Sequence, residues 1–288
     1  WGLKASQVFS RDSKLRAFSK LNRLLDDETD GLNGCIFPFA KSAITQEHLT
    51  TVATAFCGDD PVSGQTVFDF AAYDFSYIPV ETLSVIYEQF LHEPDTDQST
   101  SSLGKREGAY YTPIPLVNFM LAEMDAKHAL SHGMKVLDPS CGSGAFLVQT
   151  YRMLIERAIR ANGGNLLPPS KLRAILEAQI FGVDRDQDAC RIAEMSLLVT
   201  LLDYVNPPDL EGKYQSFRLP KLAEKNIFQA DFFDPKGSWE TALAERKNLA
   251  PFDWIVGNPP WKEIKSPPKD PRDTHALTWM GRTDAPPT

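Results

Sequence analysis

The stretch that decides the fold is Val136-Leu-Asp-Pro-Ser-Cys-Gly-Ser-Gly-Ala-Phe-Leu147. It has the pattern of a short buried strand that ends in an acid, a turn with alternate glycines, and the start of an amphipathic helix. Glycines let a backbone approach a ligand closely, and the first turn of a helix offers N–H groups without intrahelical partners. The stretch therefore predicts a ligand-binding turn; a glycine-rich turn that binds nothing is the alternative.

The chemistry of this turn differs from that of a dinucleotide site. The fingerprint G-x-G-x-x-G is incomplete, because Leu147 stands where the third glycine would be. Asp138 places a carboxylate at the end of the strand. A carboxylate there suits a ligand with an amino group or a positive charge better than it suits a pyrophosphate.

Further strands and helices are expected to alternate after the turn. Short apolar runs predict strands at 135–138, 180–184, 226–230 and 253–257, and apolar faces predict helices at 147–159 and 189–202. This alternation is typical of an α/β fold with a parallel sheet. The proline-rich residues after Trp261 are expected to be irregular.

The first third of the chain has a different pattern. Apolar spacing predicts helices at 14–25, 46–56 and 80–91, and the polar residues 92–104 predict an exposed linker. We therefore expect a helical N-terminal region at 1–104 and an α/β domain at 105–288.

Two more strand ends carry polar side chains that suit a nucleoside-like ligand. Asp184 follows the second strand, where a carboxylate can accept hydrogen bonds from both hydroxyls of a ribose. Asn258 follows the fourth strand and is itself followed by two prolines and Trp261. The Asn258 amide and the Pro259 carbonyl can hold a planar NH₂ group while Trp261 stacks on its ring. A Pro-Pro turn that caps a core strand is the alternative.

Composition excludes several classes of protein. The chain has 288 residues, 42% of them hydrophobic, and a formal net charge of −8, so it can build a core but does not attract polyanions as a whole. The spacing of its cysteines and histidines predicts no metal site. No signal peptide or membrane span is recognisable, and we expect a reduced, cytoplasmic protein. Because the chain begins with Trp1, we expect it to be a fragment.

Five motifs in order together resemble the gamma-class N6-adenine DNA methyltransferases, which include type I modification subunits and fused type IIG restriction–modification enzymes. The motifs are Gly108-Ala-Tyr-Tyr-Thr-Pro113, Asp138-Pro-Ser-Cys-Gly-Ser-Gly-Ala-Phe146, Gly182-Val-Asp184, Ala230-Asp231-Phe232 and Asn258-Pro-Pro-Trp261. The resemblance implies a Rossmann-like S-adenosylmethionine-dependent methyltransferase sheet. It also implies that the sheet is incomplete in its C-terminal half, because such enzymes continue through further strands and a target-recognition domain.

The resemblance also implies the site residues. The Tyr-Tyr-Thr-Pro segment would line the methionine end of S-adenosylmethionine, the glycine turn would hold the methionyl part, Asp184 the ribose, and Asp231 with Phe232 the adenine. The implied cofactor-binding residues are Tyr110, Thr112, Pro113, Asp138, Pro139, Cys141, Gly142, Gly144, Phe146, Asp184, Asp231 and Phe232. The implied catalytic residues are Asn258, Pro259, Pro260 and Trp261. Cys141, inside the turn, is expected to react with thiol reagents when the cofactor is absent.

The expected reaction is direct methyl transfer to the N6 atom of an adenine flipped out of double-stranded DNA. The expected partners are this DNA, read by elements outside the chain, and a specificity or nuclease module of a restriction–modification or phage-defence system. Alternatives remain at this point. An RNA guanine, a cytosine N4 or a protein glutamine also presents a planar amine, and the chain could instead be a connector or endonuclease part of a fused restriction enzyme.

Overall fold

The computed structural model describes residues 79–82, 85–86, 112–206, 217–234, 239, 251–259 and 274–281. The chain divides into two compact units, Trp1–Pro79 with Asn206–Lys221 and Val80–Val205 with Leu222–Thr288. The described strands all belong to the second unit. The helices predicted at 14–25 and 46–56 and the domain boundary near residue 105 lie outside the described residues and stay predictions.

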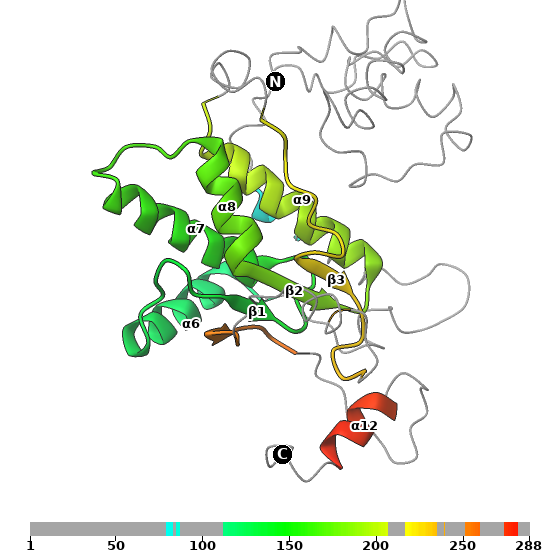
Figure 1. Ribbon diagram of the computed structural model, residues 1–288. Coiled ribbons are helices and arrows are strands. Elements are labelled where there is room, and N and C mark those ends of the chain that lie inside the picture. The colour runs from blue at the N-terminus through cyan, green and yellow to red at the C-terminus, as the bar shows by residue number, and fades with distance from the viewer. Residues whose placement is uncertain are drawn as a thin grey trace, which may run out of the picture. The chain divides into compact units, whose positions relative to one another are not determined.

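Four parallel strands form one sheet in the order β3-β2-β1-β4 (Figure 1). They are β1 (Val136–Asp138), β2 (Ile180–Asp184), β3 (Ile227–Gln229) and β4 (Trp254–Ile255). Each lies within a range predicted from the sequence, so the predicted α/β fold with a parallel sheet is confirmed. Because β2 and β4 flank β1, the strand order reverses beside β1, and ligands of open α/β sheets bind at the carboxyl ends of strands at such a point.

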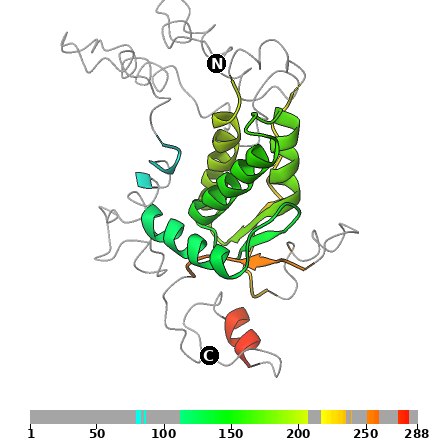
Figure 2. The same cartoon turned by 90° about the vertical axis from the view of Figure 1, so that its left-hand side faces the viewer.

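Helices α7, α8 and α9 lie together on one side of the sheet (Figures 1 and 2). The described helices are α6 (Ile114–Lys127), α7 (Ala145–Ala161), α8 (Pro169–Gln179), α9 (Gln187–Asp203) and α12 (Thr274–Met280). Helix α7 contacts β1 and β2, and α9 contacts β2 and β3. The two helices predicted after the glycine turn correspond to α7 and α9. None of the helices within the described ranges has the length and apolar character needed to cross a membrane.

Helix α12 contradicts the prediction of irregular structure after Trp261. The region after Trp261 was expected to be irregular, but residues 274–280 form a helix. The prolines that suggested irregular structure lie before and after this segment, which itself contains neither proline nor glycine. Nothing within it therefore interrupts a helix.

The core lies between the sheet and its helices. Strand β1 is buried along its whole length, and the largest fully buried side chains include Trp254, Tyr151, Phe181 and Phe228. Removing these aromatic rings from water contributes a large share of the stability of such a core.

Asn226 joins α8 to the sheet through polar contacts inside this core. Its side-chain Nδ2 donates to the carbonyl oxygens of Leu176, Glu177 and Ile180 at 3.3, 3.1 and 2.7 Å. The backbone carbonyl oxygen of Asn226 accepts from the Gly182 N–H at 2.8 Å. The bonds from the Asn226 side chain satisfy carbonyl oxygens at the C-terminal end of α8 that have no partner within the helix.

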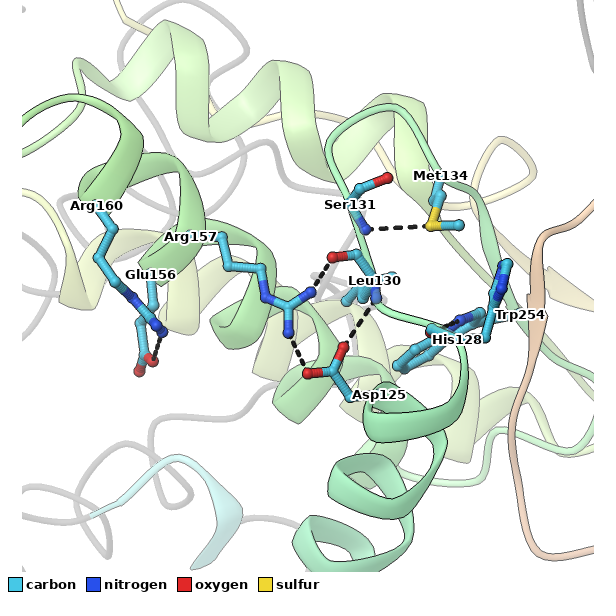
Figure 3. A network of polar contacts seen from close by, with 9 residues as sticks. All are labelled: Asp125, His128, Leu130, Ser131, Met134, Glu156, Arg157, Arg160 and Trp254. Atoms are coloured by element: carbon cyan, nitrogen blue, oxygen red, sulfur yellow. Dashed lines mark hydrogen bonds and ion pairs between the residues drawn. The ribbon is translucent and has the colours of Figure 1, made fainter.

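A polar network fixes α6 and the connection to β1 (Figure 3). Arg157 of α7 donates to the Leu130 carbonyl and pairs with Asp125 of α6, and Asp125 accepts from the Leu130 N–H at 2.8 Å. The hydrogen bond from Arg157 lowers the pKa of Asp125. On β4, Trp254 Nε1 donates to the His128 carbonyl at 3.1 Å. The network thus connects α6, α7 and β4.

Candidate functional site

Four polar side chains that the sequence analysis identified as candidate site residues lie at or just after the carboxyl ends of the four strands. Asp138 ends β1, Asp184 ends β2, Asp231 follows β3, and Asn258 follows β4. Because all four strands are parallel, these ends share one edge of the sheet. Parallel pairing thus explains why residues far apart in the sequence gather at one site.

The glycine turn connects β1 to α7 and is held by both acids. The Ser140 N–H donates to Asp138 Oδ1 at 3.0 Å, and the Gly142 N–H donates to Asp184 Oδ2 at 2.8 Å. Gly144 is the N-cap of α7, with a φ of 91° that favours glycine. The two acidic side chains therefore fix the backbone of the turn by accepting hydrogen bonds from it.

Asp138 lies beneath the segment that follows β4. It is 1% exposed, and burial, with the nearby Asp184 charge adding to it, raises its pKa to about 8 against the hydrogen bond from Ser140. A Cβ atom at Gly257 would lie 2.5 Å from Asp138 Oδ1, closer than Cβ atoms approach a non-bonded atom. Only glycine therefore lets this segment pass over the carboxylate. The sequence prediction ended a strand at Gly257 but gave no sign of this contact.

Asp184 is half-buried at the end of β2. Its Oδ1 accepts from the Asp186 N–H at 2.8 Å, and its Oδ2 holds the Gly142 N–H. Burial raises its pKa, and hydrogen bonds from the two N–H groups oppose that shift. Each carboxylate oxygen can accept more than one hydrogen bond, so Asp184 keeps acceptor capacity for a ligand.

Asp231 is part of a polar cluster at the end of β3. Its Oδ2 contacts Arg185 Nη2 at 2.9 Å and His275 Nδ1 of α12 at 3.3 Å, while its Oδ1 accepts from the Phe233 N–H at 3.0 Å. The neighbouring Phe232 stacks on Trp239, with ring centroids 5.1 Å apart. Sequence reasoning identified Asp231 and Phe232 but not Arg185 or His275, because no local pattern relates them.

Asn258 contacts the Thr-Pro segment that precedes α6. Its Nδ2 donates to Thr112 Oγ1 at 3.2 Å, across 146 positions of sequence. Pro113 is the N-cap of α6, and Pro259 is exposed. The structure thus places Thr112, from the first of the five motifs, next to Asn258, from the last one. The remaining predicted residues of these two segments, Tyr110, Pro260 and Trp261, lie outside the described ranges.

The other residues of the turn face the interior to different degrees. Phe146 and Cys141 are buried, and Pro139 is half-buried. A hydrogen bond with the Cys190 thiol and burial raise the pKa of the Cys141 thiol. Burial and the raised pKa both disfavour the reactive thiolate, so the structure does not support the expected reactivity of Cys141 toward thiol reagents. Over the described ranges, no group of three His, Cys, Asp or Glu side chains could hold a metal ion.

Comparison with known proteins places the chain in a family. The N-6 DNA Methylase family matches residues 80–280, which is more than half of the chain. The chain belongs to this family. The proteins that it resembles include the type I restriction enzyme HindI methylase subunit of Haemophilus influenzae, at 26% identity over 84% of this chain and 49% of that protein.

Other proteins that the chain is similar to are described as combining restriction with methylation or modification. The type II restriction enzyme and methyltransferase RM.Eco57I of Escherichia coli is 26% identical over 68% of this chain and 23% of that protein. Among solved structures, the type IIL restriction-modification enzyme MmeI in complex with DNA is 20% identical, with a TM-score of 0.49 over 83% of this chain and 31% of that chain. The chain thus spans about half or less of the length of these similar proteins.

Proposed function

We propose that this chain carries the cofactor site and target-base site of an S-adenosylmethionine-dependent DNA adenine-N6 methyltransferase of a restriction–modification system. One observation carries the proposal. In a member of the N-6 DNA methylase family, two acids and an asparagine amide gather at the carboxyl ends of adjacent parallel strands. The family match favours a DNA adenine over an RNA guanine or a protein glutamine as the acceptor.

The residues around the turn fit the cofactor. Two carboxylates with raised pKa values lie close together, and a cationic ligand would relieve this unfavourable arrangement. A Cβ atom at Gly142 would meet nothing within 4 Å, so the turn is open at that point. Within the described residues, the buried Ser140 Oγ also has no hydrogen-bond partner. A ligand with a sulfonium, an amino group and a ribose suits these features.

Each residue then has a defined task. Asp138 and Asp184 bind the cationic and ribose parts of S-adenosylmethionine, which supplies an electrophilic methyl group when bound. The Asn258 Oδ1 and the Pro259 carbonyl accept hydrogen bonds from the N6 hydrogens of the target adenine. These bonds favour the tetrahedral nitrogen of the transition state over the planar amine of the ground state. The adenine has to leave the duplex to reach them, at a cost of a few kcal/mol.

The test is a methylation assay on unmethylated genomic DNA, which contains many different short recognition sequences. The chain is incubated with methyl-labelled S-adenosylmethionine, alone and together with the partner subunits of its restriction–modification system, and the DNA is digested to nucleosides for mass spectrometry. We expect label in N6-methyldeoxyadenosine, and we expect Asn258→Ala to lower the rate about 100-fold or more while leaving cofactor binding intact. Label in N4-methyldeoxycytidine, or in added RNA or protein only, would contradict the proposal.

A further inference from the structure

We infer that His275 of α12 is a positioning residue that, together with Arg185, holds the Asp231 carboxylate for the adenine of the cofactor. This inference rests on the proposed function and extends it to the base of S-adenosylmethionine. Neither His275 nor Arg185 belongs to any of the five motifs. The observation that carries the inference is that both side chains contact one oxygen, Asp231 Oδ2, at 3.3 Å and 2.9 Å.

The order of the strands places Asp231 where the base of the cofactor belongs. Strand β2 lies between β1 and β3, and Asp184 at its end is assigned to the ribose. Asp138, at the end of β1, is assigned to the cationic part of the cofactor. Because the methionyl part and the base are attached on opposite sides of the ribose, the base extends toward the end of β3. Asp231 and Phe232 follow that strand.

The chemistry of the cluster fixes the direction of its hydrogen bonds. A carboxylate only accepts and a guanidinium only donates. The ion pair with Arg185 makes Asp231 Oδ2 an acceptor, so His275 Nδ1 has to carry a hydrogen. Asp231 Oδ1 accepts from the Phe233 N–H at 3.0 Å, and a carboxylate oxygen can accept more than one hydrogen bond. The carboxylate therefore suits the exocyclic NH₂ group of adenine and repels a carbonyl oxygen at that position.

Two different elements hold the carboxylate in place. Arg185 lies between β2 and α9, and His275 lies on α12. The Asp231 side chain is 15% exposed, whereas an ion pair restrains its partners little when both are in solvent. Ala276, next to His275, is buried, so α12 is packed against the chain at this position. Donors from two packed elements on one largely buried carboxylate restrict its rotation.

The first test locates the hydrogen on the His275 ring and needs no ligand. Long-range ¹H–¹⁵N spectra at about pH 9, where an ordinary histidine is neutral, distinguish a hydrogen on Nδ1 from one on Nε2. The His275 signals are those missing from His275→Asn. We expect a hydrogen on Nδ1 in the wild type and a shift toward Nε2 in Asp231→Ala. A wild-type ring that carries its hydrogen on Nε2 alone would overturn the inference, even if Asp231→Ala fails to fold.

The second test compares binding of S-adenosylhomocysteine with binding of S-inosylhomocysteine, in which a carbonyl oxygen replaces the 6-amino group. By calorimetry, we expect the wild type to prefer the adenosine compound at least about tenfold. His275→Leu should bind S-adenosylhomocysteine about threefold to tenfold more weakly and should bind the inosine compound as the wild type does. His275→Asn, whose amide nitrogen can replace Nδ1 as the donor, should restore the preference.

The matched control is His132→Leu, because His132 is an exposed histidine on the connection between α6 and β1 and should bind both compounds as the wild type does. A His275→Leu variant with unchanged affinities, or with equal losses for both compounds, would overturn the inference. A wild type that binds both compounds equally would also overturn it and would leave the proposed function intact. A wild type that binds neither compound would refute the proposed cofactor site, and the inference with it.

Discussion

Asp138 is an acid whose charged form is disfavoured by its own surroundings. It lies beneath Gly257, close enough to exclude a Cβ atom, and its pKa is raised to about 8. An apolar residue of similar size would avoid the cost of burying a carboxyl group in the unliganded protein. The presence of an acid at this position is explained if a cationic ligand stabilises its charged form, as the proposed cofactor would.

The stability of the unliganded chain should therefore depend on pH through Asp138. The folded-state pKa of about 8 lies above the ordinary aspartate value of 3.8, so the folded state binds the proton more tightly than the unfolded state. The stabilising contribution is complete below pH 4 and is lost as pH rises from about 4 to 8. Its slope is at most about 1.4 kcal/mol per pH unit. Urea unfolding across this range measures the slope.

The matched control for this prediction is Asp138→Asn, which keeps the shape of the protonated acid but cannot ionise. Burial also raises the pKa values of Asp184 and Glu194, and these groups act in the same direction in both proteins. The difference between the two curves therefore isolates Asp138. Curves of the wild type and Asp138→Asn that run parallel from pH 4 to pH 8 would show that Asp138 has no raised pKa.

At the scale of elements, the turn between β1 and α7 uses its two glycines for different purposes. Both have positive φ values, 51° at Gly142 and 91° at Gly144. A Cβ atom at Gly144 would lie 3.0 Å from the Cβ of Ala193 on α9, whereas one at Gly142 would meet nothing within 4 Å. Gly144 therefore permits the close packing of two helices, and Gly142 keeps the open side of the turn clear.

Alanine substitutions at Gly142 and at Gly144 should separate the role in ligand access from the role in helix packing. Each substitution forces a non-glycine residue into a left-handed conformation, at a cost of about 1 kcal/mol. Gly144→Ala should lose roughly 1–3 kcal/mol more, because Ala193 has to move. The Gly142→Ala variant should keep most of the stability of the wild type and bind S-adenosylmethionine at least about tenfold more weakly than the wild type does. Urea unfolding and calorimetry measure the two effects; unimpaired binding by Gly142→Ala would contradict the proposed ligand position.

The elements themselves were largely predictable from the sequence, because short apolar runs that end in an acid or a glycine carry a local signal. All four strands lie within predicted ranges. The contacts between elements were not predictable in the same way. The bond from Asn258 to Thr112 and the cluster of Asp231 with His275 each join segments more than forty positions apart, and only the packed fold decides which side chains meet.

At the scale of the whole molecule, net charge limits how the chain can contact DNA. A formal net charge of −8 does not favour association with a polyanion. The chain also matches only 49% of the HindI methylase subunit. We therefore propose that partner proteins supply most of the phosphate contacts and read the base sequence.

The most direct test of the proposed site is calorimetric titration of the chain with S-adenosylmethionine, repeated on Asp184→Ala. Asp188→Ala is the matched control, because Asp188 is a largely exposed acid on the first turn of α9. Circular dichroism verifies that all three proteins are folded. We predict that the wild type and Asp188→Ala bind one cofactor per chain and that Asp184→Ala binds at least about tenfold more weakly. A folded wild type that binds no S-adenosylmethionine, or an Asp184→Ala variant that binds it equally well, would contradict the assignment of this site.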